Sequence, residues 1–214
     1  KKISQSLLRI TNKIINPKDG LWKKDQEKIE ILKKRREIVE KSKQDKQFKI
    51  YWLIEDCKRY GTLPFAGLAR ACFIAMQIIN SLEECGLFDS NTKANFLRSV
   101  PTVATEMSID YNKLNKNEFL KKYGHLRPGT YEIANKRYDE NPDLYFDWED
   151  FKKSTVEENS FDFESIDLIK LEEIIRSNGL DTTPRDLINF LESAIQLREY
   201  SKFEFSRNLS DSLQ

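Results

Sequence analysis

The fold of this chain is decided by residues 62–84, which read TLPFAGLARACFIAMQIINSLEE. Thr62 is typical of a helix N-cap, Pro64 of a first helical turn, and Gly86 of the residue that ends a helix. Apolar side chains fall all round the helix that this stretch predicts, and such a helix lies in the centre of a protein. Its small residues would allow a neighbouring backbone or a ligand to approach closely. The stretch therefore predicts a central, buried helix.

Helical spacing of apolar residues recurs on both sides of this stretch. Gly61 is predicted to end a helix over Phe48–Tyr60, as the left-handed residue after the last turn. The other predicted helices cover Leu7–Ile15, Trp22–Lys43, Asn91–Leu97, Val103–Tyr111, Glu118–Tyr123, Ser165–Ser177 and a long segment that begins at Pro184. No run alternates apolar and polar residues for long enough to predict a strand. The sequence thus predicts an all-α fold, a single irregular multi-helix domain over residues 1–214.

A long aromatic-rich loop is predicted around residues 124–160, where glycine and proline interrupt the helical pattern. Tyr145, Phe146 and Trp148 are interpreted as anchors that hold this loop against the helices, with a binding role second.

The charge balance limits the possible partners. The 36 Lys and Arg residues face 35 Asp and Glu, so the formal net charge is +1. This balance removes the positive excess by which proteins bind nucleic acids or anionic membranes, and neither partner is expected. The dense charges of Trp22–Lys43 most simply form a solvated helix face. The single histidine excludes zinc sites and metalloprotease sites that need two, and no metal site is predicted.

Three cysteines, Cys57, Cys72 and Cys85, lie widely spaced in apolar helical patterns. Their number and spacing predict reduced, buried thiols in a cytoplasmic protein. No uncharged run reaches the ~18 apolar residues of a membrane span, and no signal-peptide pattern is present. The chain begins at Lys1 without an initiator Met and stops at Gln214 within a helical pattern, so we expect it to be a piece of a larger protein.

The strongest local feature is the loop that reads GHLRPGTYEI over residues 124–133. Two glycines and a proline shape a tight turn that carries His125, Arg127, Tyr131 and Glu132. A guanidinium suits bidentate capture of a carboxylate or phosphate, and a histidine titrates near neutrality. These four residues are therefore candidates for substrate binding. The alternative is a structural turn whose polar side chains cap helix ends.

Arg70 and Glu106 are two further candidates for substrate binding. The helical neighbours of Arg70 are apolar or small, and a buried arginine needs an anion from a side chain or a ligand. Alternatively, Arg70 starts a polar, solvated edge, or it pairs structurally with Glu106. Glu106 lies in a mildly apolar helix, where a surface carboxylate is the simpler interpretation.

The sequence shows no complete catalytic apparatus, since it has neither a GxxxxGK[ST] loop nor a GxGxxG motif after a strand. The stretch Gly124–Ile133, with Arg137-Tyr138 after it, resembles the central helical region of phosphotransferases like the PEP-utilising enzymes. This group includes phosphoenolpyruvate synthase-like proteins, rifampin phosphotransferase and the glutamine kinase of capsule phosphoramidate pathways. Gly61–Arg70 and Leu197–Phe203 resemble further blocks of the capsule-cluster branch, so the similarity covers about residues 61–203.

The resemblance implies a three-part enzyme. In that arrangement one domain uses ATP and Mg, a swivelling domain carries a phosphohistidine, and a helical domain binds the small-molecule acceptor. This chain would be the helical domain, inactive alone and without a cofactor of its own. Arg70, His125, Arg127 and Glu132 would face the acceptor or its phosphate. Leu126 and Thr130-Tyr131 favour the capsule-cluster branch, where an amino-acid amide such as glutamine is the acceptor.

Two functions stay open at this point. One is the acceptor-binding domain of an ATP-dependent phosphotransferase, whose ATP-binding and phosphohistidine domains belong to the same polypeptide. The other is a non-catalytic helical interaction module, in which the charged helix Trp22–Lys43 is the partner surface.

Overall fold

The computed structural model describes residues 2–129, 132, 134–148, 161 and 166–214. In chain order its helices are α1 (Lys2–Ile15), α2 (Leu21–Lys41), α3 (Lys46–Asp56), α4 (Leu63–Glu84), α5 (Ser90–Ser99), α6 (Val103–Lys113), α7 (Lys116–Tyr123), α8 (Pro142–Tyr145), α9 (Leu168–Ser177) and α10 (Pro184–Ser212). A π-helical turn, η1 (Cys57–Thr62), joins α3 to α4. The described residues form helices and no strand, which confirms the predicted all-α class.

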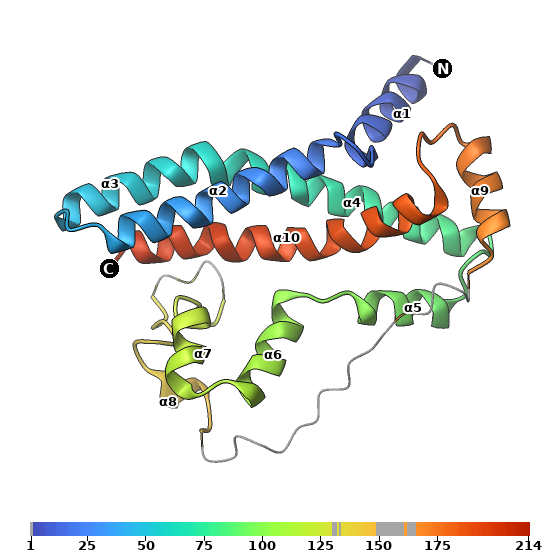
Figure 1. The fold of residues 1–214 in the computed structure, drawn as a ribbon. Coiled ribbons are helices and arrows are strands. Elements are labelled where there is room, and N and C mark those ends of the chain that lie inside the picture. The colour runs from blue at the N-terminus through green and yellow to red at the C-terminus, as the bar shows by residue number, and fades with distance from the viewer. Residues whose placement is uncertain (1, 130–131, 133, 149–160, 162–165) are drawn as a thin grey trace.

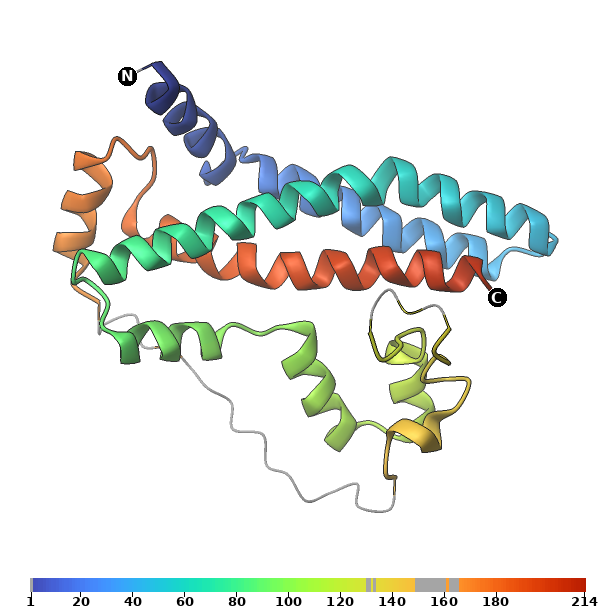
Figure 2. The ribbon, with the colours of Figure 1, turned by 180° about the vertical axis from the view of Figure 1, so that it is seen from behind.

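Three long rods lie side by side and form the body of the molecule (Figures 1 and 2). They are α2, the continuous rod α3–η1–α4, and α10. α1 extends beyond one end of this bundle, and the C-terminus lies at the other end, near the turn between α2 and α3. The helices α5–α8 run as an arm along one side of the bundle. The arm and the bundle therefore bring segments far apart in the sequence next to one another.

α4 packs against both α2 and α10, but only one of its faces is buried. Leu68, Ala71, Ala75 and Ile79 are fully buried, whereas Phe73 on the opposite face is 66% exposed. A helix with two long neighbours keeps one stripe towards solvent, however apolar its sequence is. The expectation of a helix buried all round is corrected in this respect.

The junction of α3 and α4 corrects the prediction that Gly61 ends a helix. The rod continues through η1, where Gly61 is buried, and a ring carbon of Phe205 lies 2.8 Å from the position that a Cβ would take. Pro64 has no N–H and crowds the carbonyl four residues before it, and the wider π turn gives its ring room. The Thr62 hydroxyl donates to the Cys57 carbonyl at 3.3 Å instead of capping a new helix. The glycine is required by the approach of Phe205, not by a helix end.

Most predicted helix ends are confirmed. Gly86 and Gly179 have φ of 69° and 68° just after α4 and α9. The side chains of Asp89, Thr102 and Thr183 accept backbone N–H groups at the starts of α5, α6 and α10. These ends depend on residues within one turn of each other, which is why the sequence predicts them.

A second apolar cluster lies in the arm. Phe119, Tyr123 and Phe203 form its centre, and Phe146 and Trp148 pack against it. The predicted anchoring is confirmed for these last two side chains, and the same cluster joins the arm to α10 through Phe203. Tyr145 packs elsewhere, with its ring 5.1 Å from that of Tyr138 and its hydroxyl donating to the Lys136 carbonyl.

The three cysteines are free, as predicted, but they differ in burial. Cys57 and Cys72 are buried in the rod, whereas Cys85 follows the last turn of α4 and is exposed. The prediction of a buried thiol is therefore wrong for Cys85.

The rod Lys46–Glu84 contains a window that is long and apolar enough to cross a membrane by length and composition. The core helix of a bundle passes the same test, and one stripe of this rod packs against α2 and α10.

Candidate functional site

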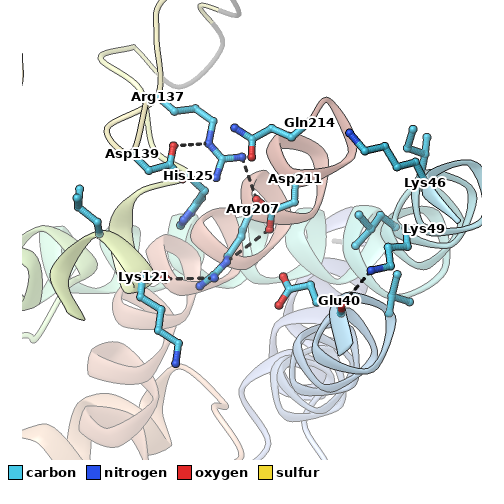
Figure 3. Close-up of a pocket in the computed structure, with 14 residues that line it drawn as sticks. Glu40, Lys46, Lys49, Lys121, His125, Arg137, Asp139, Arg207, Asp211 and Gln214 are labelled. Atoms are coloured by element: carbon cyan, nitrogen blue, oxygen red, sulfur yellow. Dashed lines mark hydrogen bonds and ion pairs between the residues drawn. The ribbon is translucent and has the colours of Figure 1, made fainter. Parts of the chain in front are cut away.

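A cavity of about 500 Å³ lies where the end of α10 meets α2, α3, α7 and the loop after α7 (Figure 3). Five Lys and Arg side chains and three carboxylates line it. We call it the His125 cavity; its walls include Glu40, Lys46, Lys49, Lys121, His125, Arg207 and Asp211. It combines residues from both ends of the chain with the loop that the sequence singles out.

The backbone around His125 is fixed by hydrogen bonds to neighbouring segments. The His125 carbonyl accepts a hydrogen bond from the Ser210 hydroxyl of α10 at 3.0 Å. The carbonyls of Gly124 and Leu126 accept the backbone N–H groups of Asp139 and Tyr138 at 3.1 and 2.9 Å. The loop thus holds His125 in one place against the end of α10.

The His125 side chain is buried, with 4% of the residue exposed, and its ring lies 4.6 Å from that of Phe203 in an edge-on arrangement. Neither ring nitrogen makes a well-aligned hydrogen bond to a described residue, although a weak hydrogen bond to the Phe203 backbone acts on the pKa of the ring. Burial, together with the positive charges of Arg207, Arg137 and Arg36, lowers the pKa of the imidazole to about 2. The ring is therefore neutral near pH 7 and offers one donor and one acceptor.

Lysines supply the positive charge on the other walls. Lys46 and Lys49 come from the first turn of α3, and Lys121 comes from α7. The Lys49 ammonium donates to the Glu40 carbonyl at 3.1 Å. Within the described ranges, none of the three lysines forms an ion pair with a carboxylate. Their charges are available to an anionic ligand.

The arginines of the cavity are engaged to different degrees. Arg137 donates two hydrogen bonds to the Asp139 carboxylate, 2.9 and 2.6 Å long, and also forms an ion pair with Asp211 at 3.0 Å. Arg207 donates to the Lys121 carbonyl at 3.2 Å, and its Nε lies 3.6 Å from Asp211. That Nε is buried and makes no hydrogen bond to a described residue. Arg137 therefore holds the loop against α10, whereas the Nε–H group of Arg207 makes no hydrogen bond to a described residue.

The carboxylates of the cavity are largely neutralised. Asp139 and Asp211 lie against Arg137, and burial raises the pKa of Glu40. The Glu40 carboxylate lies 3.6 Å from Arg36. The cavity as a whole favours an anion.

Of the residues predicted to bind substrate, His125 alone is on the wall of this cavity. Arg127 lies next to it, but its guanidinium is used structurally: it donates to the Ser210 hydroxyl at 2.6 Å and to the Asn135 carbonyl at 3.0 Å. Glu132 is exposed, and its backbone N–H donates to the Gly129 carbonyl in a turn. Tyr131 lies outside the described residues.

Arg70 and Glu106 lie outside the His125 cavity, although Glu106 lines a second depression beside it. Arg70 is exposed on α4, at the start of the polar edge that continues with Gln77, Ser81 and Glu84. Glu106 is exposed on α6, with its carboxylate 3.6 Å from the Lys122 ammonium. No ion pair joins Arg70 to Glu106 within the described residues, and Arg70 and Arg127 do not line a common pocket there. Arg70 therefore lies on a solvated edge, and its positive charge partly offsets the burial that raises the pKa of Asp25.

Sequence reasoning missed Lys46, Lys49, Lys121 and Arg207. Lysines at these places look like ordinary charges of solvated helices, and nothing local distinguishes them. Only the packing of α3 and α7 beside the end of α10 places them together.

No group of three or more His, Cys, Asp or Glu residues in the described part of the chain could hold a metal ion. No protein-family model, curated protein or solved structure matches the chain.

Proposed function

We propose that this chain is the acceptor-binding domain of an ATP-dependent phosphotransferase, and that the acceptor binds in the His125 cavity. The observation that carries the proposal is a buried histidine, whose ring makes no well-aligned hydrogen bond to a described residue, on the wall of a cavity rich in lysine. Buried polar atoms are normally hydrogen-bonded, so such a ring is suited to bind a ligand. The resemblance of the loop Gly124–Ile133 to the phosphotransferases supports the class of enzyme.

The residues of the cavity would bind and orient the acceptor rather than perform the transfer. The neutral ring of His125 can donate one hydrogen bond and accept another, while Lys46, Lys49 and Lys121 attract negative charge. Holding an acceptor in one orientation accelerates the reaction with a second domain, because it removes the entropy of alignment. ATP, Mg and the phosphohistidine would belong to the other domains.

Phosphate transfer from ATP in the full-length protein tests this assignment. We expect His125→Gln and Lys46→Met each to lower turnover about tenfold, since each removes hydrogen bonds or charge at the ligand. Lys43→Met is the matched control, because Lys43 is exposed just before α3 and does not line the cavity. Full turnover in both cavity variants would show that the acceptor does not bind in this cavity.

An interaction module is the second candidate, and one observation favours it. α1 extends beyond the bundle and leaves Ile3, Leu7 and Ile10 79%, 59% and 50% exposed, on one helical face. Replacing Leu7 and Ile10 together by lysine should abolish a complex that depends on this face. A complex that survives the double substitution, together with ligand-induced thermal stabilisation, would exclude this candidate.

A further inference from the structure

A second depression adjoins the His125 cavity. This groove, about 640 Å³ in volume, lies between α2 on one side and α6 and α7 on the other, with α10 as its floor. Glu40, Lys121 and Arg207 line both the groove and the cavity. The two spaces are therefore neighbours that share the Arg207 side chain as part of their walls.

Several buried polar atoms around these two spaces make no hydrogen bond to a described residue. They include both ring nitrogens of His125 in the cavity, and Nε of Arg207 and Nε of Arg36, which lie 3.6 Å from the carboxylates of Asp211 and Glu40. Such atoms are rare in folded proteins, because each loses its hydrogen bonds to water on burial. The two arginine nitrogens are shared with carboxylates, so the His125 ring is the group beside these spaces with the most hydrogen-bonding capacity left.

The cavity end of this path suits a tetrahedral oxyanion. A planar carboxylate is best held by a free guanidinium fork, but the fork of Arg137 is already occupied by Asp139 and Asp211. What the cavity offers instead is three lysines, which act as point charges, and the neutral ring of His125. Point charges of this kind suit the oxygens of a phosphate group, which do not need a planar fork.

The groove end has a different chemistry. Lys33 and Glu37 of α2 face it from one wall, Glu118 and Lys122 of α7 from the other, and Tyr200 lies on its floor. Basic and acidic side chains thus line both walls of the groove, and their charges nearly cancel. Such a surface suits a neutral body with many hydroxyl groups, each of which can donate and accept.

We propose that the chain binds a phosphate monoester of a polyhydroxylated molecule, of the sugar-phosphate class. Its phosphate lies among Lys46, Lys49, Lys121 and His125, and its hydroxyl-bearing body lies in the groove beyond Arg207. The inference rests on the proposed function, because this molecule would be the acceptor. It replaces the amino-acid amide that the family resemblance implies.

Calorimetric titration of the full-length protein without ATP tests the inference, with inorganic phosphate, glucose 6-phosphate, glucose and L-glutamine as probes at constant ionic strength. We expect glucose 6-phosphate to bind about tenfold more tightly than inorganic phosphate, because it adds hydrogen bonds in the groove. Glucose and L-glutamine should bind more weakly than either. The inference is overturned if glucose 6-phosphate binds no more tightly than phosphate, or if glutamine binds most tightly.

Substitutions locate the two ends of the ligand. Lys46→Ala should weaken the binding of phosphate and of glucose 6-phosphate about tenfold, whereas Glu37→Ala should weaken only the binding of glucose 6-phosphate. Lys43→Ala, the exposed control, should weaken neither. Equal binding in Lys46→Ala and Lys43→Ala would overturn the placement of the phosphate.

The outcomes separate this inference from the proposed function. Loss of turnover in the cavity variants without binding of glucose 6-phosphate would leave the proposed function standing and remove the ligand class. Binding as described with unchanged turnover would support the ligand class and remove the proposed function.

Discussion

The guanidinium of Arg36 on α2 lies 2.6 Å from the carboxylate of Glu204 on α10, and both side chains are only 3% exposed. Arg36 also donates to the side-chain oxygen of Asn208 at 3.1 Å. This buried ion pair links two of the three rods beneath the groove that adjoins the His125 cavity. A charge run that the sequence presents as a solvated face thus contains one arginine that is part of the core.

Replacing one member of this pair should destabilise the protein strongly. We expect Arg36→Met to lower the free energy of unfolding by about 3–5 kcal/mol, because Glu204 would remain charged and buried without its partner. The double variant with Glu204→Met should recover much of this loss, since two apolar side chains leave no buried charge. Denaturant unfolding measures both effects.

The control for this pair is an exposed one on α9, Glu172 and Arg176, whose side chains are 47% and 78% exposed. Arg176→Ala should change stability by less than about 1 kcal/mol. An equal effect at both pairs would show that burial does not govern the contribution of Arg36.

His125 should make stability depend on pH. Its pKa is lowered to about 2 in the folded protein, against the ordinary value near 6.5 in the unfolded chain. The unfolded state therefore binds more protons below pH 6.5, and this contribution to stability is lost as pH falls from 6.5 towards 2. Between pH 7 and pH 5 the loss should be about 2 kcal/mol. His125→Gln should remove this part of the pH dependence.

The chain contains a single histidine, so its imidazole signals can be followed by NMR without assignment. We expect no titration of these signals between pH 5 and pH 8 in the folded protein. A midpoint near pH 6.5 would contradict the buried, neutral ring.

Gly61 should not tolerate a side chain. A Cβ there would lie 2.8 Å from the Phe205 ring, which itself stacks on Phe65 at a ring separation of 5.6 Å. We expect Gly61→Ala to lower stability by about 1–3 kcal/mol, although alanine favours helices. Adding Phe205→Leu should relieve the contact. Thermal unfolding of the single and double variants checks this, and a Gly61→Ala variant at least as stable as the parent would refute it.

The three thiols should differ in reactivity. Cys85 is exposed, whereas burial raises the pKa of the Cys57 thiol to about 12 and Cys72 is buried. An aromatic disulfide reagent should modify one thiol rapidly in the folded protein and all three in denaturant. Cys85→Ser should remove the rapid phase, and a rapid phase that persists would place a second thiol at the surface.

Local signals explain the parts of the fold that the sequence predicts well. The helix starts at Asp89 and Thr183 and the end at Gly86 depend on hydrogen bonds and backbone angles within a few residues. Gly61 shows the limit of such reasoning. The residue that requires a glycine there is Phe205, far along the chain, and no local pattern reveals it.

The all-α class and most helix boundaries follow from the residue order alone, because helical periodicity and capping are short-range effects. Packing decides the rest. It leaves Arg70 in solvent, buries Arg36 against Glu204 and brings Lys46 and Lys49 to His125. These relationships depend on which faces of the rods meet. A helix with two long neighbours buries only part of its surface. Which face is buried depends on the helices that pack against it, and these lie elsewhere in the chain.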